Sequence, residues 1–123
     1  MPSFGTLKAD TLTHSTAGSL ATNFVVNGSS VCWVDFQGAA STISPLASLN
    51  VSSLDDDGTG SYGVNVTSAM SSADYVCLTG GNAYHNVTAN SQTTTAWDIE
   101  QYNSSHSAAD ANVSNGAIHG DLA

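Results

Sequence analysis

Short runs in which apolar and polar residues alternate recur along the chain and predict β-strands. The clearest run is TTTAWDIEQY, where Trp97 and Ile99 alternate with Asp98 and Glu100. A period of two places the apolar side chains on one face of a strand and the polar ones on the other. The run therefore predicts a half-buried strand with its two carboxylates on the solvent side.

Two further alternating runs, SLNVSSL and SYGVNVT, flank the stretch LDDDGTG. An Asp-Gly pair between two such runs is typical of a β-hairpin whose glycines adopt positive φ. We therefore expect one hairpin, with the aspartates at its solvent-exposed tip. Its apolar positions would be Leu49, Val51, Val64 and Val66.

Other runs carry different or weaker signals. SVCWVDF and DYVCLT are apolar on both faces, as expected of central strands or of strands covered by another sheet or subunit. FGTLK, TNFVV, NAYHNV and NVSNGAIH are weaker strand candidates, giving roughly eight or nine short strands in all. No window shows helical periodicity, so a helix is limited to a turn or two, for which SAMSSADY is the candidate.

These elements predict an all-β fold. Many short strands separated by polar turns favour an antiparallel β-sandwich or a jelly-roll-like domain, and 123 residues suit one core. Residues 31–123 are assigned to this domain. Residues 1–30 are sparser in apolar side chains and are predicted to form an extended N-terminal arm, with the first strands, that packs on a neighbour.

Charge narrows the classes of partner. The formal net charge is −9 and Lys8 is the sole basic residue, so binding to nucleic acid or to an anionic membrane is disfavoured. The first residues lack a basic and apolar leader, and no apolar run approaches the ~20 residues that span a bilayer. We expect a soluble protein made in a cytoplasm.

The consecutive aspartates raise the question of a metal. An EF-hand loop requires a bidentate glutamate at its twelfth position, which is Val66 when Asp55 is counted first. Asp55 and Asp57 thus remain candidates only for a simpler surface calcium site. The G-x-G-x-x-G match in the same stretch leads into a strand rather than a helix, so no dinucleotide or other cofactor is expected.

Histidine and cysteine leave alternatives open. The four histidines have no metal-binding spacing, which favours surface positions over an ion on a threefold axis. Cys32 and Cys77 lie in apolar runs and are interpreted as small buried residues, with a disulfide between neighbouring strands as the alternative.

Catalytic patterns are equally sparse. The sequence contains no nucleophile elbow or phosphate-binding loop. Asp98 and Glu100 lie ~6–7 Å apart on one strand face, which is compatible with glycosidase chemistry but is commoner as solubilising charge. We expect that the protein is not an enzyme.

Several segments carry a family resemblance: THSTAGS, the W-V-x-F run from Trp33 to Phe36, LNVSSL, DGTGSYGVNVTSAMSSADY and the terminal HGDLA. Together they resemble a module of small virion proteins and tail-fibre-like proteins of marine tailed bacteriophages and prophages. The run before Trp33 departs from that pattern, because Val31 and Cys32 stand where a basic residue is usual.

The resemblance implies a non-enzymatic structural role on the virion surface, after assembly in the host cytoplasm. A capsid decoration protein, cement protein or head fibre would form a homotrimer and bind the major capsid protein or other virion proteins. The candidate interface residues are Phe4, Leu7, Leu12, Val31 and Trp33.

The alternative is a short tail fibre or receptor-binding protein. In that case the loops at 55–60 and 82–86 would contact a host receptor.

Overall fold

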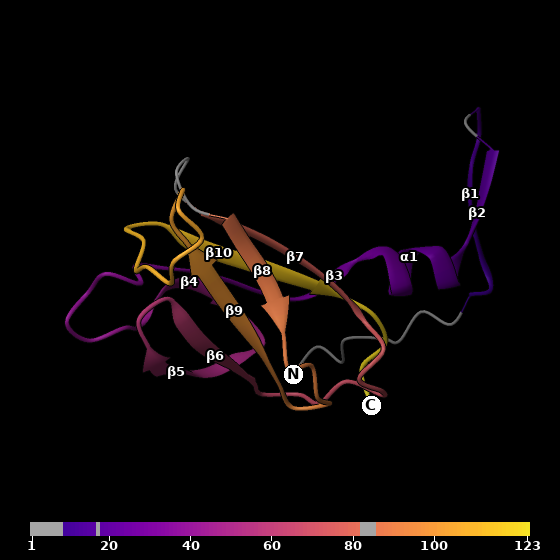
Figure 1. Ribbon diagram of the computed structural model, residues 1–123. Coiled ribbons are helices and arrows are strands. Elements are labelled where there is room, and N and C mark those ends of the chain that lie inside the picture. Colours follow the sequence, from indigo (N-terminus) through magenta and orange to yellow (C-terminus); the bar gives the residue numbers. More distant parts are fainter. Residues whose placement is uncertain (1–8, 17, 82–85) are drawn as a thin grey trace.

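The computed structural model describes residues 9–16, 18–81 and 86–123, and these form ten strands and one helix (Figure 1). In chain order the elements are β1 (Thr11–His14), β2 (Gly18–Ala21), α1 (Thr22–Gly28), β3 (Ser30–Phe36), β4 (Pro45–Leu49), β5 (Val51–Gly58), β6 (Ser61–Val66), β7 (Val76–Gly81), β8 (Asn86–Asn90), β9 (Ala96–Tyr102) and β10 (Ser114–His119).

Eight of the strands form two antiparallel sheets. The first sheet has the order β4-β3-β10-β7 and the second sheet has the order β5-β6-β9-β8. Their inner faces supply one shared core, so the predicted all-β antiparallel sandwich is confirmed. The finer jelly-roll expectation is not confirmed, because β3 with β4 and β5 with β6 are successive strands paired within one sheet.

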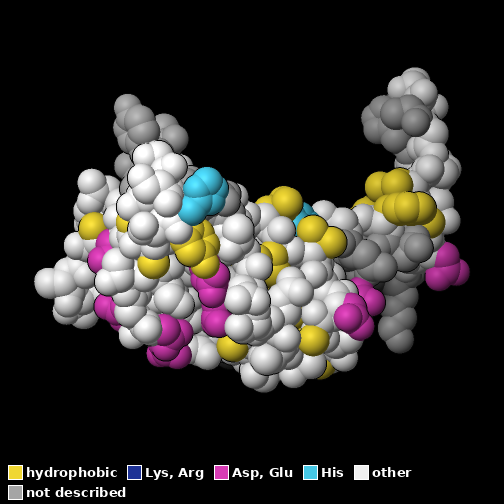
Figure 2. Space-filling model, in the orientation of Figure 1, with side chains coloured by type: hydrophobic (Ala, Val, Ile, Leu, Met, Phe, Trp, Pro, Cys, Tyr) yellow, Lys and Arg dark blue, Asp and Glu magenta, His cyan; other side chains and the backbone are white. Residues whose placement is uncertain are grey.

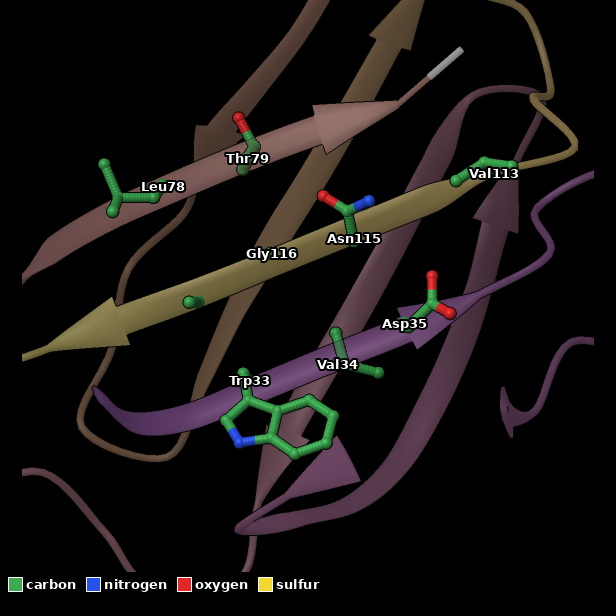
Figure 3. A pocket seen from close by; sticks show the side chains of 9 residues that line it. Trp33, Val34, Asp35, Leu78, Thr79, Val113, Asn115 and Gly116 are labelled. Carbon is green, nitrogen blue, oxygen red and sulfur yellow. The ribbon is translucent and has the colours of Figure 1, made fainter. Parts of the chain in front are cut away.

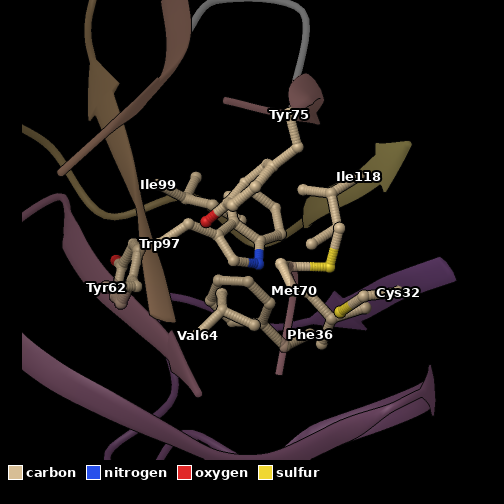
Figure 4. Close-up of a cluster of buried hydrophobic side chains, with 10 residues drawn as sticks. Cys32, Phe36, Tyr62, Val64, Met70, Tyr75, Trp97, Ile99 and Ile118 are labelled. Atoms are coloured by element: carbon tan, nitrogen blue, oxygen red, sulfur yellow. The ribbon is translucent and has the colours of Figure 1, made fainter. Parts of the chain in front are cut away.

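The core is built by the alternation that the sequence predicts. Trp97 and Ile99 of β9 and Tyr62 and Val64 of β6 are fully buried and meet side chains of the first sheet, as Figure 4 shows. Phe36 packs edge-on against Tyr62, with ring centroids 5.2 Å apart. Such an edge-to-face arrangement is favoured by the charge distribution of aromatic rings.

The run SLNVSSL is not one strand, which corrects the expected hairpin. It is divided at Asn50, whose φ of 57° turns the chain from β4 in the first sheet into β5 in the second. The Asn50 side chain holds this turn, because Oδ1 accepts from the Ser68 amide at 2.7 Å and Nδ2 donates to the Ser68 carbonyl at 3.1 Å. Asparagine tolerates the left-handed region through such local hydrogen bonds.

The β5–β6 hairpin itself is confirmed, with Gly58 and Gly60 at φ of 122° and 69°. The aspartates are not at its tip, because β5 continues through them and the chain reverses at Thr59 and Gly60. Asp110 fixes the reversal by accepting hydrogen bonds from the Gly60 amide and the Tyr62 hydroxyl, both at 2.7 Å.

The N-terminal region is not simply extended. Its described part, residues 9–16 and 18–30, contains the β1–β2 hairpin and then helix α1, which lie beside the sandwich and are directed away from it (Figure 1). The predicted strand TNFVV is therefore wrong. Phe24 and Val25 are adjacent rather than alternating, and a segment without a pairing strand satisfies its backbone locally as a helix. SAMSSADY contains no helix.

Candidate functional site

A row of apolar side chains crosses the outer face of the first sheet from edge to edge. The strand register places Trp33 opposite Leu49 on one side and opposite Ala117 on the other, and Ala117 is opposite Leu78. Side chains directly opposite one another across antiparallel strands are near neighbours. We call this row, together with Val76, two residues before Leu78, the apolar face.

These side chains are open to solvent although they are large. Their exposed fractions are 37% for Trp33, 48% for Leu49, 56% for Leu78 and 60% for Val76. Single exposed apolar residues are ordinary, but contiguous patches mark interaction surfaces. The apolar face therefore is the strongest candidate for a binding surface among the described residues.

A polar row lies beside the apolar face. Asp35 is opposite Asn115, and Asn115 is opposite Gly80. A shallow groove over β10 runs between Trp33 of β3 and Leu78 of β7 (Figure 3). Asp35 is the sole acidic residue in strands β3, β4, β7 and β10. An uncharged apolar centre with a polar rim is the usual anatomy of a protein–protein interface.

The outer face of the second sheet has the opposite character. Asp55 and Asp98 lie on either side of Gly63, and the Asp57 carboxylate also reaches over this glycine. Asn65 Nδ2 donates to Asp55 Oδ2 at 2.7 Å. Because Gly63 has no side chain, the acidic groups cluster there, and this face presents negative charge to solvent.

The predicted pairing of Asp98 and Glu100 on one strand face is present. Both oxygens of Glu100 are engaged, because Tyr102 donates to Oε2 at 2.6 Å and Asn90 Nδ2 donates to Oε1 at 3.1 Å. These hydrogen bonds lower the pKa of Glu100. A glycosidase general acid needs a raised pKa, so Glu100 is not suited to that role.

The candidate calcium ligands do not form a complete site. Asp55 and Asp57 lie on exposed parts of β5, and no three or more His, Cys, Asp or Glu side chains of the described residues group so that they could hold a metal ion. Of the histidines, His119 contacts the Gly28 carbonyl through Nδ1 at 3.2 Å, and His106 occupies a turn with φ of 58°. His85 lies outside the described residues.

Both cysteines are free thiols on the inner face of the first sheet. Cys32 and Cys77 are each opposite Ile118, so β10 separates them. Two strand spacings are ~9–10 Å, beyond the ~7 Å limit for the Cα atoms of a disulfide. Burial raises the pKa of Cys32 to about 11 and outweighs the opposing effect of the Trp97 indole. The interpretation as a small buried residue therefore fits Cys32, whereas Cys77 is only partly buried.

The predicted interface residues are scattered. Trp33 is at the centre of the apolar face, whereas the partly buried Val31 packs against the core and Leu12 lies on the distant β1. Phe4 and Leu7 lie outside the described residues. Leu49, Leu78, Val76 and Ala117 were not among the predicted residues, although the two-sided apolar pattern around Leu78 was a signal that could have found it.

Comparisons with known proteins add no relative. The chain matches no family model, no curated protein and no solved structure. Among the described residues, no helix is long and apolar enough to cross a membrane.

Proposed function

We propose that this protein is a non-enzymatic structural protein of a bacteriophage virion: a capsid accessory protein of the decoration, cement or head-fibre type that assembles as a homo-oligomer on the virion surface. The observation that carries the proposal is the two-sided sandwich. One sheet shows an apolar face and the other shows an acidic face. The sequence resemblance to virion proteins supplies the biological context.

Covering the apolar face would hold the copies of the homo-oligomer together on the virion surface. Burial of apolar surface stabilises a complex by about 25 cal/mol per Å² removed from water, before the costs of association. Trp33 is at the centre of the face, and aromatic residues in that position dominate the binding energy of many interfaces. The polar row of Asp35 and Asn115 then forms part of the solvent-accessible rim of the interface.

The acidic face would point to solvent. Asp55, Asp57, Asp98 and Glu100 lie on the outer side of the second sheet. Negative charge on the exposed side of a densely covered particle keeps neighbouring particles apart and soluble. Such a division suits a protein that coats a surface.

Occupancy on purified capsids tests the proposal. Capsids that lack this protein are mixed with the full chain or with Trp33→Asp, and bound protein is measured after sedimentation. Thr59→Asp is the matched control, since it adds the same charge at the exposed β5–β6 turn. We expect Trp33→Asp to lower occupancy at least ~10-fold and the control to bind normally.

A reconstruction of the virion supplies the location. Density for this chain on the head is expected. Density confined to the tail would overturn the capsid assignment and favour the receptor-binding alternative. Equal occupancy of Trp33→Asp and of the unaltered chain would remove the apolar face from the binding role.

A further inference from the structure

A second apolar surface lies in the N-terminal hairpin-helix segment, which we define as residues 9–16 and 18–28. Leu12 and Leu20 are directly opposite each other in the β1–β2 hairpin, so they share one of its faces. Phe24 of α1 is 66% exposed, and Val25, Leu12 and Leu20 are exposed as well. Figure 2 shows hydrophobic side chains gathered over α1 and the base of the hairpin.

The segment lacks the means to be stable by itself. An isolated two-stranded hairpin is marginal in water, and so is a helix shorter than ~12–15 residues. Helix α1 has seven residues, no side-chain hydrogen bond at its N-cap, no acidic residue in its first turn and no basic residue in its last turn. Internal contacts join the two parts at Thr22, whose amide and hydroxyl donate to the carbonyls of Asp10 and Ala9. The order of the segment therefore calls for an external surface.

The sandwich of the same copy contacts the segment at the end of α1, where His119 Nδ1 lies 3.2 Å from the Gly28 carbonyl oxygen, and leaves the apolar side chains of the segment exposed. Strands β1 and β2 pair with each other and belong to neither sheet. Helix α1 leads through Ser29 directly into β3, and Figure 1 shows the segment running outward beyond the end of the sandwich. Its exposed side chains are therefore placed to reach a neighbouring molecule.

We propose that the hairpin-helix segment of one copy packs on the apolar face of a second copy. The inference rests on the proposed function, because it names what covers the apolar face in the homo-oligomer. Each copy then offers one segment and one face, which is a head-to-tail contact. Head-to-tail contacts close into rings when the rotation permits, and a ring of three copies would give the trimer expected from the resemblance.

Charge favours this pairing over other contacts between copies. Two molecules of formal net charge −9 repel each other, so they approach most easily where charge is absent. The segment carries one acidic residue, Asp10, and the first sheet carries one, Asp35. The acidic face of the second sheet would oppose contact.

Size is also suitable. A standard interface uses ~20–30 residues from each partner. The segment spans about 20 residues and exposes several large apolar side chains, so it can supply the apolar centre of one side of such an interface. The opposing row of Leu49, Trp33, Ala117 and Leu78 crosses all four strands, which gives the segment a full sheet width to occupy.

Complementation between two full-length variants tests the arrangement. Phe24→Asp combined with Leu20→Asp alters the segment and leaves the apolar face intact. Leu78→Asp combined with Trp33→Asp alters the face and leaves the segment intact. We expect the unaltered chain to be oligomeric by light scattering after size-exclusion chromatography, each variant to be monomeric, and an equimolar mixture of the two variants to form a 1:1 dimer.

The mixture decides the outcome because one intact segment and one intact face remain in it. Formation of the mixed dimer also shows that both variants are folded. Thr59→Asp is the matched control and is expected to oligomerise as the unaltered chain does. In the mixture, we expect affinity to be at least ~100-fold higher than for either variant alone.

Other results would overturn the inference. If the segment variant still oligomerises, faces pair with faces; if the face variant does, segments pair with segments. A monomeric unaltered chain, or a mixture without a mixed dimer, would also contradict it. Capsid occupancy separates the two proposals: capsid binding without head-to-tail assembly refutes this inference alone, and assembly without capsid binding refutes the virion role alone.

Discussion

Replacing Gly116 by alanine gives a sharp test of how the core is packed. Gly116 is on β10 and faces the Trp97 ring. A Cβ at this position would overlap Cη2 of Trp97 and would lie 3.0 Å from Cζ3 and 3.2 Å from Cδ1 of Ile99. Carbon atoms in contact normally lie ~3.5–4.0 Å apart. Because Trp97 and Ile99 are fully buried, neither can move aside into solvent.

The expected cost follows from these contacts. Overpacking a well-packed core costs ~1–3 kcal/mol, and the overlap with a rigid ring puts Gly116→Ala toward the upper end. The smaller entropy of the unfolded alanine chain offsets ~0.4–1 kcal/mol. We therefore expect the free energy of unfolding to fall by about 2 kcal/mol.

Gly80→Ala is the matched control on the neighbouring strand β7. Its Cβ would lie 2.6 Å from Oδ1 of Asn115, the end of an exposed side chain that can rotate away. Gly80→Ala should change the free energy of unfolding by no more than ~0.5 kcal/mol. Urea unfolding followed by tryptophan fluorescence, at one fixed protein concentration, measures both variants. Equal stability of Gly116→Ala and Gly80→Ala would refute the packing argument.

Other changes test the hairpin turn and the buried thiol. Tyr62→Phe removes the hydroxyl that donates to Asp110, so the free energy of unfolding should fall by ~1–2 kcal/mol in urea titrations, and an unchanged value would contradict the role of this bond. Gly60→Ala should lower the free energy of unfolding by at least ~3 kcal/mol in the same assay, because φ is 69° and the new Cβ would lie 2.5 Å from the Gln101 carbonyl oxygen. A decrease below ~1 kcal/mol would show that the turn relaxes. Because burial raises the pKa of Cys32 from 9.0 to about 11, the folded protein retains a proton that the unfolded chain loses, so stability should fall by about 1 kcal/mol per unit as pH rises from 9 towards 11. Burial also raises the pKa of Tyr62 and of Tyr75, so Cys32→Ala should make the fall in stability with pH shallower by this amount without abolishing it, and an equally steep profile would refute the assignment.

Local periodicity was sufficient to predict much of the sandwich. The alternation of Trp97 and Ile99 with Asp98 and Glu100 correctly separated the buried and solvent sides of β9. The glycines at 58 and 60 correctly predicted the β5–β6 reversal. These features depend on residues close together in the chain, where a period of two and the freedom of glycine act directly.

Features set by distant contacts could not be predicted in the same way. Asn50 looks like one polar position in an alternating run, and only its hydrogen bonds to Ser68 show that the chain changes sheet there. The apolar face depends on the register that brings Leu49, Trp33, Ala117 and Leu78 into one row. Register across four strands is a property of the whole sheet, so no single run contains it.

Helix α1 escaped prediction for a different reason. Seven residues provide about two turns, too few to establish a hydrophobic period. Phe24 and Val25 resemble strand residues by propensity, because aromatic and β-branched side chains favour strands. Propensity is a weak guide where no strand is available for pairing, since the backbone must still satisfy its hydrogen bonds.

The contrast between β9 and β3 connects these sequence patterns to function. Strand β9 carries the apolar residues Trp97 and Ile99 on the inner side and Asp98 and Glu100 on the outer side, so only its inner side needs to be buried by another layer. Strand β3 buries Cys32, Val34 and Phe36 against the second sheet, yet also presents Trp33 outward between Leu49 and Ala117. A strand that is apolar on both faces buries all its apolar side chains only when both faces are covered. The sandwich supplies one cover for β3, and the assembly that we propose supplies the other.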